Sequence, residues 1–346
     1  MRALSRAGRR TNVAALAVLG LAMASGVLAF ATGSEAAVRV VVAVHGIAGL
    51  CLVLLTPWKA VIVRRGLAKA GRGLGGRGAS VALGALVLLV VGTGIAHAVG
   101  ATGPYLGVTT MQVHVGAAIV VGVLVLLHAW GRHQRPRHSD LGRRGLLRAG
   151  ALAGGGALLW SATEVAAGAV SLPGADRRAT GSHERGTDDP GHMPVTQWLS
   201  DSVPAADAAR FRLEVIAGRT VALGVSDLDG SDSVRAVLDC TGGWYAEQDW
   251  RGVRLDHLLA ETVGVPEHGR SIDVVSLTGY RRRLPLTEAS SLLLATSVAA
   301  RPLSRDHGAP VRLVAPGRRG FWWVKWVARI EVVDAPWWLQ PPFPGQ

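Results

Sequence analysis

The first half of the chain alternates between long apolar runs and short polar loops. Each run approaches the length of about 20 residues that a helix needs to cross a lipid bilayer. The runs cover approximately Val13–Thr32, Val38–Val63, Ser80–Val99, Thr109–Trp130 and Ala149–Val170. This pattern predicts a transmembrane bundle of about five α-helices over residues 1–170, with the lipid bilayer as its surroundings.

The hydrophobic pattern changes after residue 170. Residues 171–193 are polar, with glycine, proline and mixed charges, which predicts a flexible linker. Beyond them, Leu255–Val263 and Leu286–Leu294 have a helix-like pattern. Short strand-like runs separate them: Arg212–Ile216, Val234–Leu238, Ile272–Leu277, Val311–Val314 and Ile330–Val333. Residues 194–346 are therefore predicted to form one compact α+β domain.

The net charge of +13 is concentrated at the N-terminus and in alternate loops of the predicted bundle. Its carriers are Arg2, Arg6, Arg9 and Arg10; Lys59, Arg64, Arg65, Lys69, Arg72 and Arg77; and Arg132, Arg135, Arg137, Arg143, Arg144 and Arg148. Positive loops stay in the cytoplasm, so an odd number of spans predicts an extracytoplasmic C-terminal domain on the cell membrane. Since no basic patch remains on that domain, nucleic acid is excluded as a partner.

Two arginines precede the fifth apolar run, in Gly142-Arg143-Arg144-Gly145-Leu146-Leu147-Arg148. This segment resembles a twin-arginine translocation signal inside the chain. Such export suits a domain that must fold around its cofactor in the cytoplasm. The alternative is that these arginines only mark the cytoplasmic end of the fifth helix.

Histidines inside predicted spans are the first candidates for function, because ionisable residues are costly in a bilayer. His45 in the second run and His114 in the fourth lie at similar depth on helices that run in the same direction. Two facing imidazoles are the ligand set of a b-type haem. The alternative is hydrogen bonding between helices. His97 is a further candidate, as a substitute ligand or a contact to a propionate or a quinone.

The chain has two cysteines, and they cannot pair because Cys51 lies in the second span and Cys240 in the external domain. A single thiol in an oxidising compartment favours a bound metal. The segment Arg305–Trp326 is rich in glycine and proline and carries arginine, histidine and lysine. Such a segment suits the phosphate of an anionic organic cofactor beside a thiolate-bound metal.

Several ordered motifs in the C-terminal domain carry a family resemblance. They are Cys240, Trp250-Arg251-Gly252-Val253, Thr278-Gly279-Tyr280, Leu284-Pro285-Leu286 and the stretch Arg305–Trp326. Through them, residues 194–346 resemble the molybdopterin domain of the sulfite oxidases and of the periplasmic methionine sulfoxide reductase catalytic subunit. The resemblance implies a cofactor of molybdenum and molybdopterin.

The resemblance also implies roles for individual residues. It makes Cys240 the molybdenum ligand and Tyr280 the active-site tyrosine. It places His307 and Arg312 on the pterin, and Trp323, Val324 and Lys325 around its phosphate end. The alternatives are a buried structural thiol for Cys240 and a core tyrosine at a strand end for Tyr280. Residues 195–199 stand where the sulfite oxidases carry an Arg/Asn/His stretch, and this departure argues against sulfite as the substrate.

These observations predict a membrane-bound, molybdopterin-dependent oxidoreductase. It is expected to transfer an oxygen atom to or from a small-molecule substrate and to exchange electrons with a quinone or another membrane redox partner through haem b. Two alternatives stay open. In the first, the bundle is a haem-free anchor that serves a separate cytochrome. In the second, the domain is a catalytically inactive binding module.

Overall fold

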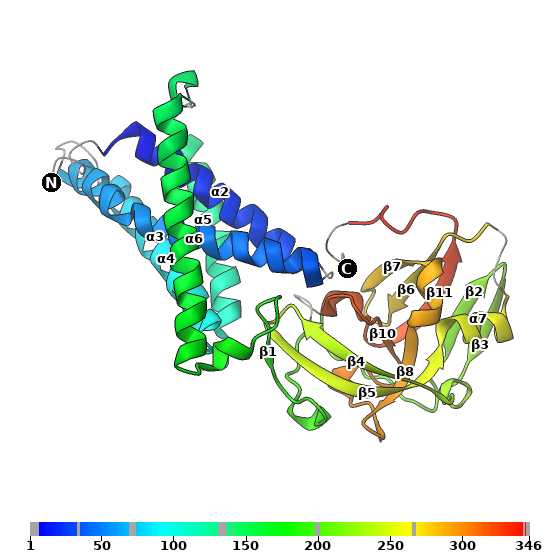
Figure 1. Cartoon of the computed structure of the whole chain (residues 1–346). Helices are drawn as coiled ribbons and strands as arrows, with labels where there is room; N and C mark the ends of the chain where they lie inside the picture. The colour runs from blue at the N-terminus through cyan, green and yellow to red at the C-terminus, as the bar shows by residue number, and fades with distance from the viewer. Residues whose placement is uncertain are drawn as a thin grey trace. The chain divides into compact units, whose positions relative to one another are not determined.

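The computed structural model describes residues 7–32, 35–68, 74–130, 137–140, 142–197, 201–264, 268–341 and 343. Contacts divide the chain into two compact units. The first takes in Met1–Phe30 and Glu35–His183, and the second takes in Ala31–Ser34 and Glu184–Gln346. The first unit is helical, whereas the second is built from strands and short helices (Figure 1).

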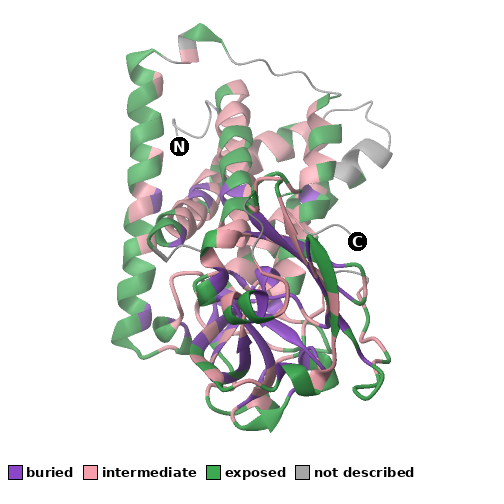
Figure 2. Ribbon diagram, turned by 90° about the vertical axis from the view of Figure 1, so that its right-hand side faces the viewer, coloured by how far each residue is buried: buried purple, intermediate pink, exposed green. Residues whose placement is uncertain are grey.

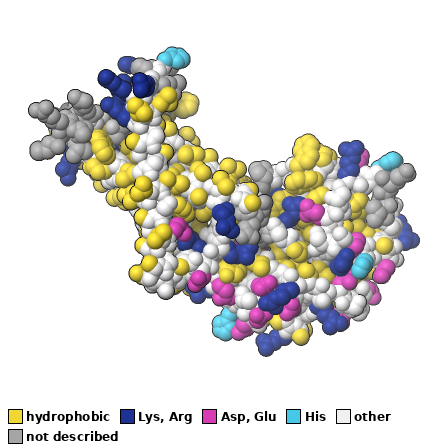
Figure 3. All heavy atoms as spheres, in the orientation of Figure 1, with side chains coloured by type: hydrophobic (Ala, Val, Ile, Leu, Met, Phe, Trp, Pro, Cys, Tyr) yellow, Lys and Arg dark blue, Asp and Glu magenta, His cyan; other side chains and the backbone are white. Residues whose placement is uncertain are grey.

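In the described part of the first unit, five helices are long. They are α2 (Arg9–Ala31), α3 (Glu35–Ala68), α4 (Leu74–Ala98), α5 (Thr110–Trp130) and α6 (Arg143–Ala169), with a 3-10 turn η1 (His138–Asp140). Large apolar side chains point outward, such as Leu126 at 71% and Trp130 at 82% exposure. Figure 3 shows hydrophobic side chains spread over this unit. Lipid tails are the surroundings that suit such a surface.

Four of the five predicted spans are confirmed among the described residues as helices long and apolar enough to cross a membrane. They are Arg9–Ala31, Ala36–Ala68, Ser80–Ala98 and Thr110–Trp130. The fifth, α6, is helical but does not belong to this group. It is rich in glycine and alanine and carries Glu164, so its hydropathy is lower. The fifth span, and the sidedness that depends on it, remain predictions.

The glycines that lower the hydropathy of α6 allow close packing between α6 and α3. A Cβ atom added at Gly156 of α6 would lie 2.5 Å from Sγ of Cys51 on α3. A Cβ atom at Gly46 of α3 would lie 2.0 Å from the ring of Trp160 on α6. Small residues at such contacts let two helix backbones approach each other, as in membrane helix pairs. The composition of α6 therefore reflects packing against a neighbouring helix.

The second unit contains two sheets. A six-stranded sheet has the order β1-β5-β8-β10, with β4 beside β5 and β9 beside β8, and a five-stranded sheet has the order β3-β2-β11-β6-β7. The strands of the first are β1 (His183–Glu184), β4 (Asp232–Cys240), β5 (Trp244–Arg254), β8 (Leu293–Val298), β9 (Arg301–Pro302) and β10 (Arg312–Val314). Those of the second are β2 (Leu213–Ala217), β3 (Arg219–Leu223), β6 (Ser271–Ser276), β7 (Arg281–Pro285) and β11 (Val327–Val333). The predicted α+β class is confirmed.

Short helices complete the second unit, and buried residues concentrate in its strands (Figure 2). The helices are α7 (Leu255–Thr262), η3 (Pro190–His192), η4 (Val225–Leu228), η5 (Leu286–Ser291), η6 (Arg305–His307) and η7 (Gly320–Trp322), while η2 (Pro173–Asp176) belongs to the first unit. The helix-like pattern at Leu255–Val263 is α7. The one at Leu286–Leu294 was wrong in part, because a 3-10 helix ends at Ser291 and β8 begins at Leu293.

The stretch predicted as a flexible linker makes defined contacts in its second half. The backbone N–H of Asp188 donates to the Glu247 carbonyl over 3.1 Å, and the Asp188 carboxylate accepts from Arg235 over 2.8 Å. Residues 184–193 thus follow β5. The sequence predicts domain boundaries at 170 and 194, whereas the structure divides the chain between His183 and Glu184.

Candidate functional site

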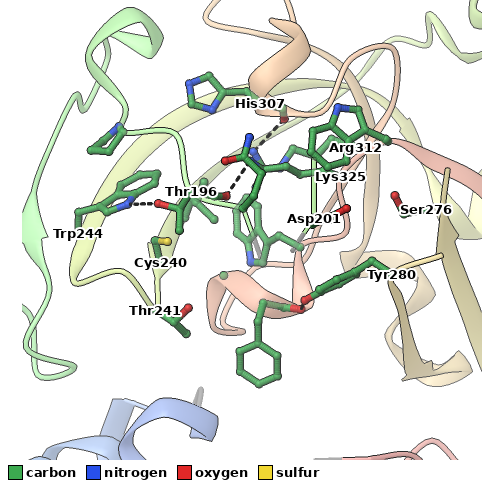
Figure 4. Close-up of a pocket in the computed structure, with 17 residues that line it drawn as sticks. Thr196, Asp201, Cys240, Thr241, Trp244, Ser276, Tyr280, His307, Arg312 and Lys325 are labelled. Carbon is green, nitrogen blue, oxygen red and sulfur yellow. Dashed lines mark hydrogen bonds between the residues drawn. The ribbon is translucent and has the colours of Figure 1, made fainter. Parts of the chain in front are cut away.

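A pocket in the second unit gathers residues that are far apart in the sequence. Its lining comes from four residues between Pro194 and Asp201, from the turn between β4 and β5, from Ser276 and Tyr280, and from the stretch 307–326. Six of the predicted site residues line it: Cys240, Tyr280, His307, Arg312, Trp323 and Lys325. Figure 4 shows how the labelled side chains converge there. Val324 lies outside the lining and is fully buried.

The Cys240 thiol stands at the end of β4, where a tight turn leads into β5. Strand β4 pairs with β5 up to Cys240 opposite Trp244, and Gly243 adopts a φ of +87° in the turn between them. The Gly242 backbone N–H donates to Sγ over 3.3 Å. Burial raises the pKa of the thiol, and the Gly242 hydrogen bond and nearby positive charges offset only part of this rise. Such a thiol becomes a thiolate when a metal binds it.

A buried ion pair fixes the loop before η7 against the strand that carries Cys240. Arg319 donates to the Asp239 carboxylate over 2.5 Å, and the two side chains are 5% and 9% exposed. The two residues also form a parallel β-bridge. Next to them, a Cβ atom at Gly320 would lie 3.0 Å from the Cα atom of Cys240. The glycine thus lets the loop backbone approach the thiol.

Arg312 lies at the base of the pocket and is built into aromatic surroundings. Its guanidinium lies 5.3 Å from the ring centre of Trp250 and 5.7 Å from that of Trp323, and it donates to the His307 carbonyl over 3.1 Å. Burial lowers its pKa to about 10. Within the described residues its Nε has no hydrogen-bond partner. A buried guanidinium with a spare donor fits an anionic group of a cofactor.

Lys325 adds a second cation on the same side of the pocket. Its Nζ donates to the carbonyls of Thr196 and Asp306 over 2.9 and 2.7 Å. Burial, and then the charge of Arg312, lower its pKa to about 8. Gly308 has a φ of +111° and lets the backbone segments that carry Arg312 and Lys325 approach each other. A Cβ atom there would lie 3.2 Å from the Cβ atoms of both residues. A buried guanidinium and a half-buried ammonium group that repel each other are stabilised by an anion between them.

His307 is held neutral in this electropositive site. It is 7% exposed, and burial together with the charges of Arg312 and Lys325 lowers its pKa to about 4. Its backbone N–H donates to the Ser304 hydroxyl over 3.3 Å, which fixes η6. A neutral imidazole can either accept or donate one hydrogen bond to a bound cofactor.

We predict that His307 makes the protein sensitive to acid. Its ordinary pKa is 6.5. Between pH 6.5 and about 4, His307 is therefore protonated in the unfolded chain but neutral in the folded chain. The free energy of unfolding should therefore fall by up to about 3 kcal/mol across this window because of His307. Urea unfolding at several pH values should show a shallower acid slope for His307→Gln. Equal slopes in both proteins would contradict the prediction.

Tyr280 closes the pocket on the side opposite the two cations (Figure 4). Its hydroxyl donates to the Phe321 carbonyl, and burial raises its pKa above its usual range. The side chain is 7% exposed. With its proton engaged by Phe321, the phenol oxygen is able to accept a hydrogen bond from a substrate.

The structure adds pocket residues that the sequence reasoning did not select. Thr196, Asp201, Trp244 and Ser276 line the pocket together with Cys240. The Thr196 hydroxyl accepts a hydrogen bond from the Trp244 indole over 3.2 Å. Thr196 lies well before Cys240 in the chain and belongs to no recognisable motif. Only the tertiary structure brings it to the thiol.

The two histidines of the predicted haem site lie together in the first unit. The ring centres of His45 on α3 and His114 on α5 are 5.9 Å apart, with an angle of 86° between the planes. Nδ1 of His45 lies 2.9 Å from the Ala22 carbonyl, and Nδ1 of His114 lies 2.8 Å from the Val90 carbonyl. A carbonyl only accepts, so each Nδ1 carries the proton and each Nε2 keeps its lone pair.

Other polar groups of the first unit lie at the end of α4. Nε2 of His97 is 3.0 Å from the Gly181 carbonyl, and Nε2 of His183 is 2.8 Å from the His97 carbonyl. The two rings are 4.8 Å apart. These hydrogen bonds tie residues 181–183 to α4. They give His97 a structural role in addition to any contact with a cofactor.

Comparison with known proteins supports this picture of the second unit. Residues 200–338 match the family model of the oxidoreductase molybdopterin binding domain. Rat mitochondrial sulfite oxidase is 31% identical over 177 residues, which are 41% of this chain and 31% of that protein. Soybean inducible NADH nitrate reductase is 31% identical over 100 residues, which are 25% of this chain and 11% of that protein.

A solved structure is also similar in part. The sulfane dehydrogenase SoxCD from Paracoccus pantotrophus matches with 25% identity and a TM-score of 0.36, over 38% of this chain and 40% of that one. The chain spans about a third of the length of the first curated relatives it matches. The C-terminal half of this protein therefore contains a sulfite-oxidase-like molybdopterin-binding domain, which follows a set of apolar helices.

Proposed function

We propose that this protein is a membrane-bound, molybdopterin-dependent oxidoreductase that exchanges an oxygen atom with a small substrate. The observation that carries the proposal is the convergence of one buried thiol, Cys240, with the buried Arg312 and the half-buried Lys325 in one pocket. When bound there, a molybdenum–pterin cofactor supplies the oxygen-atom and two-electron chemistry. The relatives named as a sulfite oxidase and a nitrate reductase support the same class of reaction.

The residues of the pocket have distinct roles in this proposal. Cys240 holds the metal, and the Gly242 N–H beside it orients the sulfur. The spare Nε donor of Arg312 and the charge of Lys325 hold the anionic end of the cofactor. Trp323 covers the Arg312 guanidinium and excludes water from it. Tyr280 offers its oxygen as an acceptor to the substrate.

We further propose that His45 and His114 bind a b-type haem, which passes electrons to or from a quinone. Metal-binding histidines usually donate the other ring N–H to a carbonyl, as both Nδ1 atoms do here. The two rings also lie close together, with centres 5.9 Å apart, as two ligands of one haem iron must. A Cβ atom added at Gly26 would lie 3.1 Å from the His45 ring, and one at Gly94 would lie 3.0 Å from the His114 ring, so a larger residue would crowd them.

Metal and haem analysis of one purified sample tests both proposals. We expect molybdenum and a reduced α band in the b-type region in the wild-type protein. His45→Ala and His114→Ala should each lose most of the haem, because a single imidazole is left to bind it. Both variants should keep the molybdenum. His138→Ala, in the exposed turn η1, is the matched control. Molybdenum without an α band would favour a haem-free anchor that serves a separate cytochrome. No molybdenum would favour a binding module without catalysis.

The placement of the C-terminal domain outside the cytoplasm is proposed from the charge of the loops and from a membrane-spanning α6. Arg143 and Arg144 open α6, and exposed Lys and Arg side chains gather at the end of the unit where α6 begins (Figure 3). Part of the basic loops, including Lys69, Arg72, Arg132 and Arg135, lies outside the described residues. Use of the twin-arginine route is tested by fractionation of a strain without that translocase, where the domain should stay cytoplasmic.

A further inference from the structure

Thr196 stands at the point where three parts of the pocket meet. Its carbonyl accepts from Lys325 Nζ over 2.9 Å, and its hydroxyl accepts from the Trp244 indole N–H over 3.2 Å. Figure 4 shows the threonine between these two side chains, on the same side of the pocket as Cys240. Its side chain is therefore held in one orientation by a donor that comes from β5.

Among the described residues, the Cys240 sulfur is a nearby acceptor for the hydroxyl proton of Thr196. The Thr196 oxygen, the Cys240 sulfur and Cδ1 of Trp244 lie 3.4, 3.5 and 3.5 Å from the position that a Cβ atom would take on Gly242. They therefore surround the same small volume. The indole and the Gly242 N–H are donors only, whereas the sulfur accepts. With the Trp244 proton directed to the threonine oxygen, the threonine proton is free to be directed to the sulfur.

We propose that Thr196 is a positioning residue that donates a hydrogen bond to the Cys240 sulfur and thereby sets the reduction potential of the metal that Cys240 binds. This inference rests on the proposed function. Together with the Gly242 N–H, the sulfur receives two donors. Hydrogen bonds to a ligand sulfur reduce its electron donation to the metal and so favour the reduced state. Trp244 acts one step further away, because it orients the threonine.

The test compares Thr196→Val with Thr196→Ser in the full-length protein loaded with cofactor. Valine keeps the shape and the backbone carbonyl to Lys325 but removes the hydroxyl, whereas serine keeps the donor. The readouts are molybdenum content, the electron paramagnetic resonance signal of Mo(V) and its potential in a redox titration. Thr196→Val should lower the ratio of reduced to oxidised metal at a fixed potential by about tenfold, which is about 59 mV for one electron. Thr196→Ser should match wild type.

A second variant probes the orienting step. Trp244→Phe keeps an aromatic side chain, although a smaller one, and removes the indole N–H, so the threonine hydroxyl is free to rotate. Its potential should lie between those of wild type and Thr196→Val. Should Thr196→Val lose its metal, Thr196→Ala removes the same hydroxyl with less bulk.

Two outcomes separate the failure of this inference from the failure of the proposed function. Wild-type protein without molybdenum overturns the proposed function. Loaded Thr196→Val or Thr196→Ala with the potential and spectrum of Thr196→Ser overturns the inference alone, because the hydroxyl is then only a packing element.

Discussion

Cys240→Ser is expected to contain almost no molybdenum and to lose oxidoreductase activity by more than about 100-fold. Loss of partners in the second coordination shell commonly costs about 10–100-fold, and removal of the ligand itself should cost more. Serine has nearly the same size, so the hairpin between β4 and β5 and the Gly242 contact should be preserved. Molybdenum is measured by elemental analysis and activity with an artificial electron donor or acceptor.

The second cysteine of the chain gives a matched control. Cys51 is also buried, but it lies on α3, where its thiol donates to the Leu152 carbonyl over 3.3 Å. Cys51→Ser should keep its molybdenum and its activity. If Cys240→Ser retained as much molybdenum as Cys51→Ser, Cys240 would be a structural thiol, and the proposed chemistry would need another ligand.

Arg319→Leu is expected to destabilise the second unit by about 3–5 kcal/mol, because it leaves the Asp239 carboxylate buried without its partner. Asp239 directly precedes Cys240, so loss of the ion pair should also loosen the loop at Gly320 that packs against the thiol. The free energy of unfolding is measured by denaturant titration of the full-length protein, with tryptophan fluorescence as the signal.

An exposed ion pair and a double variant make this prediction specific. Arg235 pairs with Asp188, Glu247 and Asp249 at the surface, and Arg235→Leu should change stability less, because solvent screens such exposed pairs. The double variant Arg319→Leu/Asp239→Leu should recover much of the loss, since no unpaired charge then remains buried. An effect of Arg319→Leu no larger than that of Arg235→Leu would mean that the buried pair contributes nothing to the fold.

Most of the secondary structure follows from local patterns. The apolar runs became α2 to α6, and the strand-like runs around Val234–Leu238 and Ile330–Val333 became β4 and β11. The stretch Leu286–Leu294 shows where local pattern is insufficient. Its leucines suit either a helix or a buried strand, and pairing of β8 with both β5 and β10 decides for the strand from Leu293 onward.

The site itself was accessible from the sequence wherever a motif carried it. Cys240, His307, Arg312 and Lys325 belong to recognisable segments, and the fold brings all four to one pocket. Thr196 was not accessible in this way. Its proposed role depends on contacts with Trp244 and Lys325, which are distant in sequence. The local sequence of residues 194–197 does not predict these contacts.

The sequence by itself determined the apolar helices, the α+β class of the second unit and the one thiol suited to bind a metal, because these depend on hydropathy, periodicity and residue chemistry. The tertiary structure alone decided which groups surround that thiol and which residues of α3 pack against the glycines of α6. Those properties depend on distances between side chains that lie far apart along the chain, and only packing sets such distances.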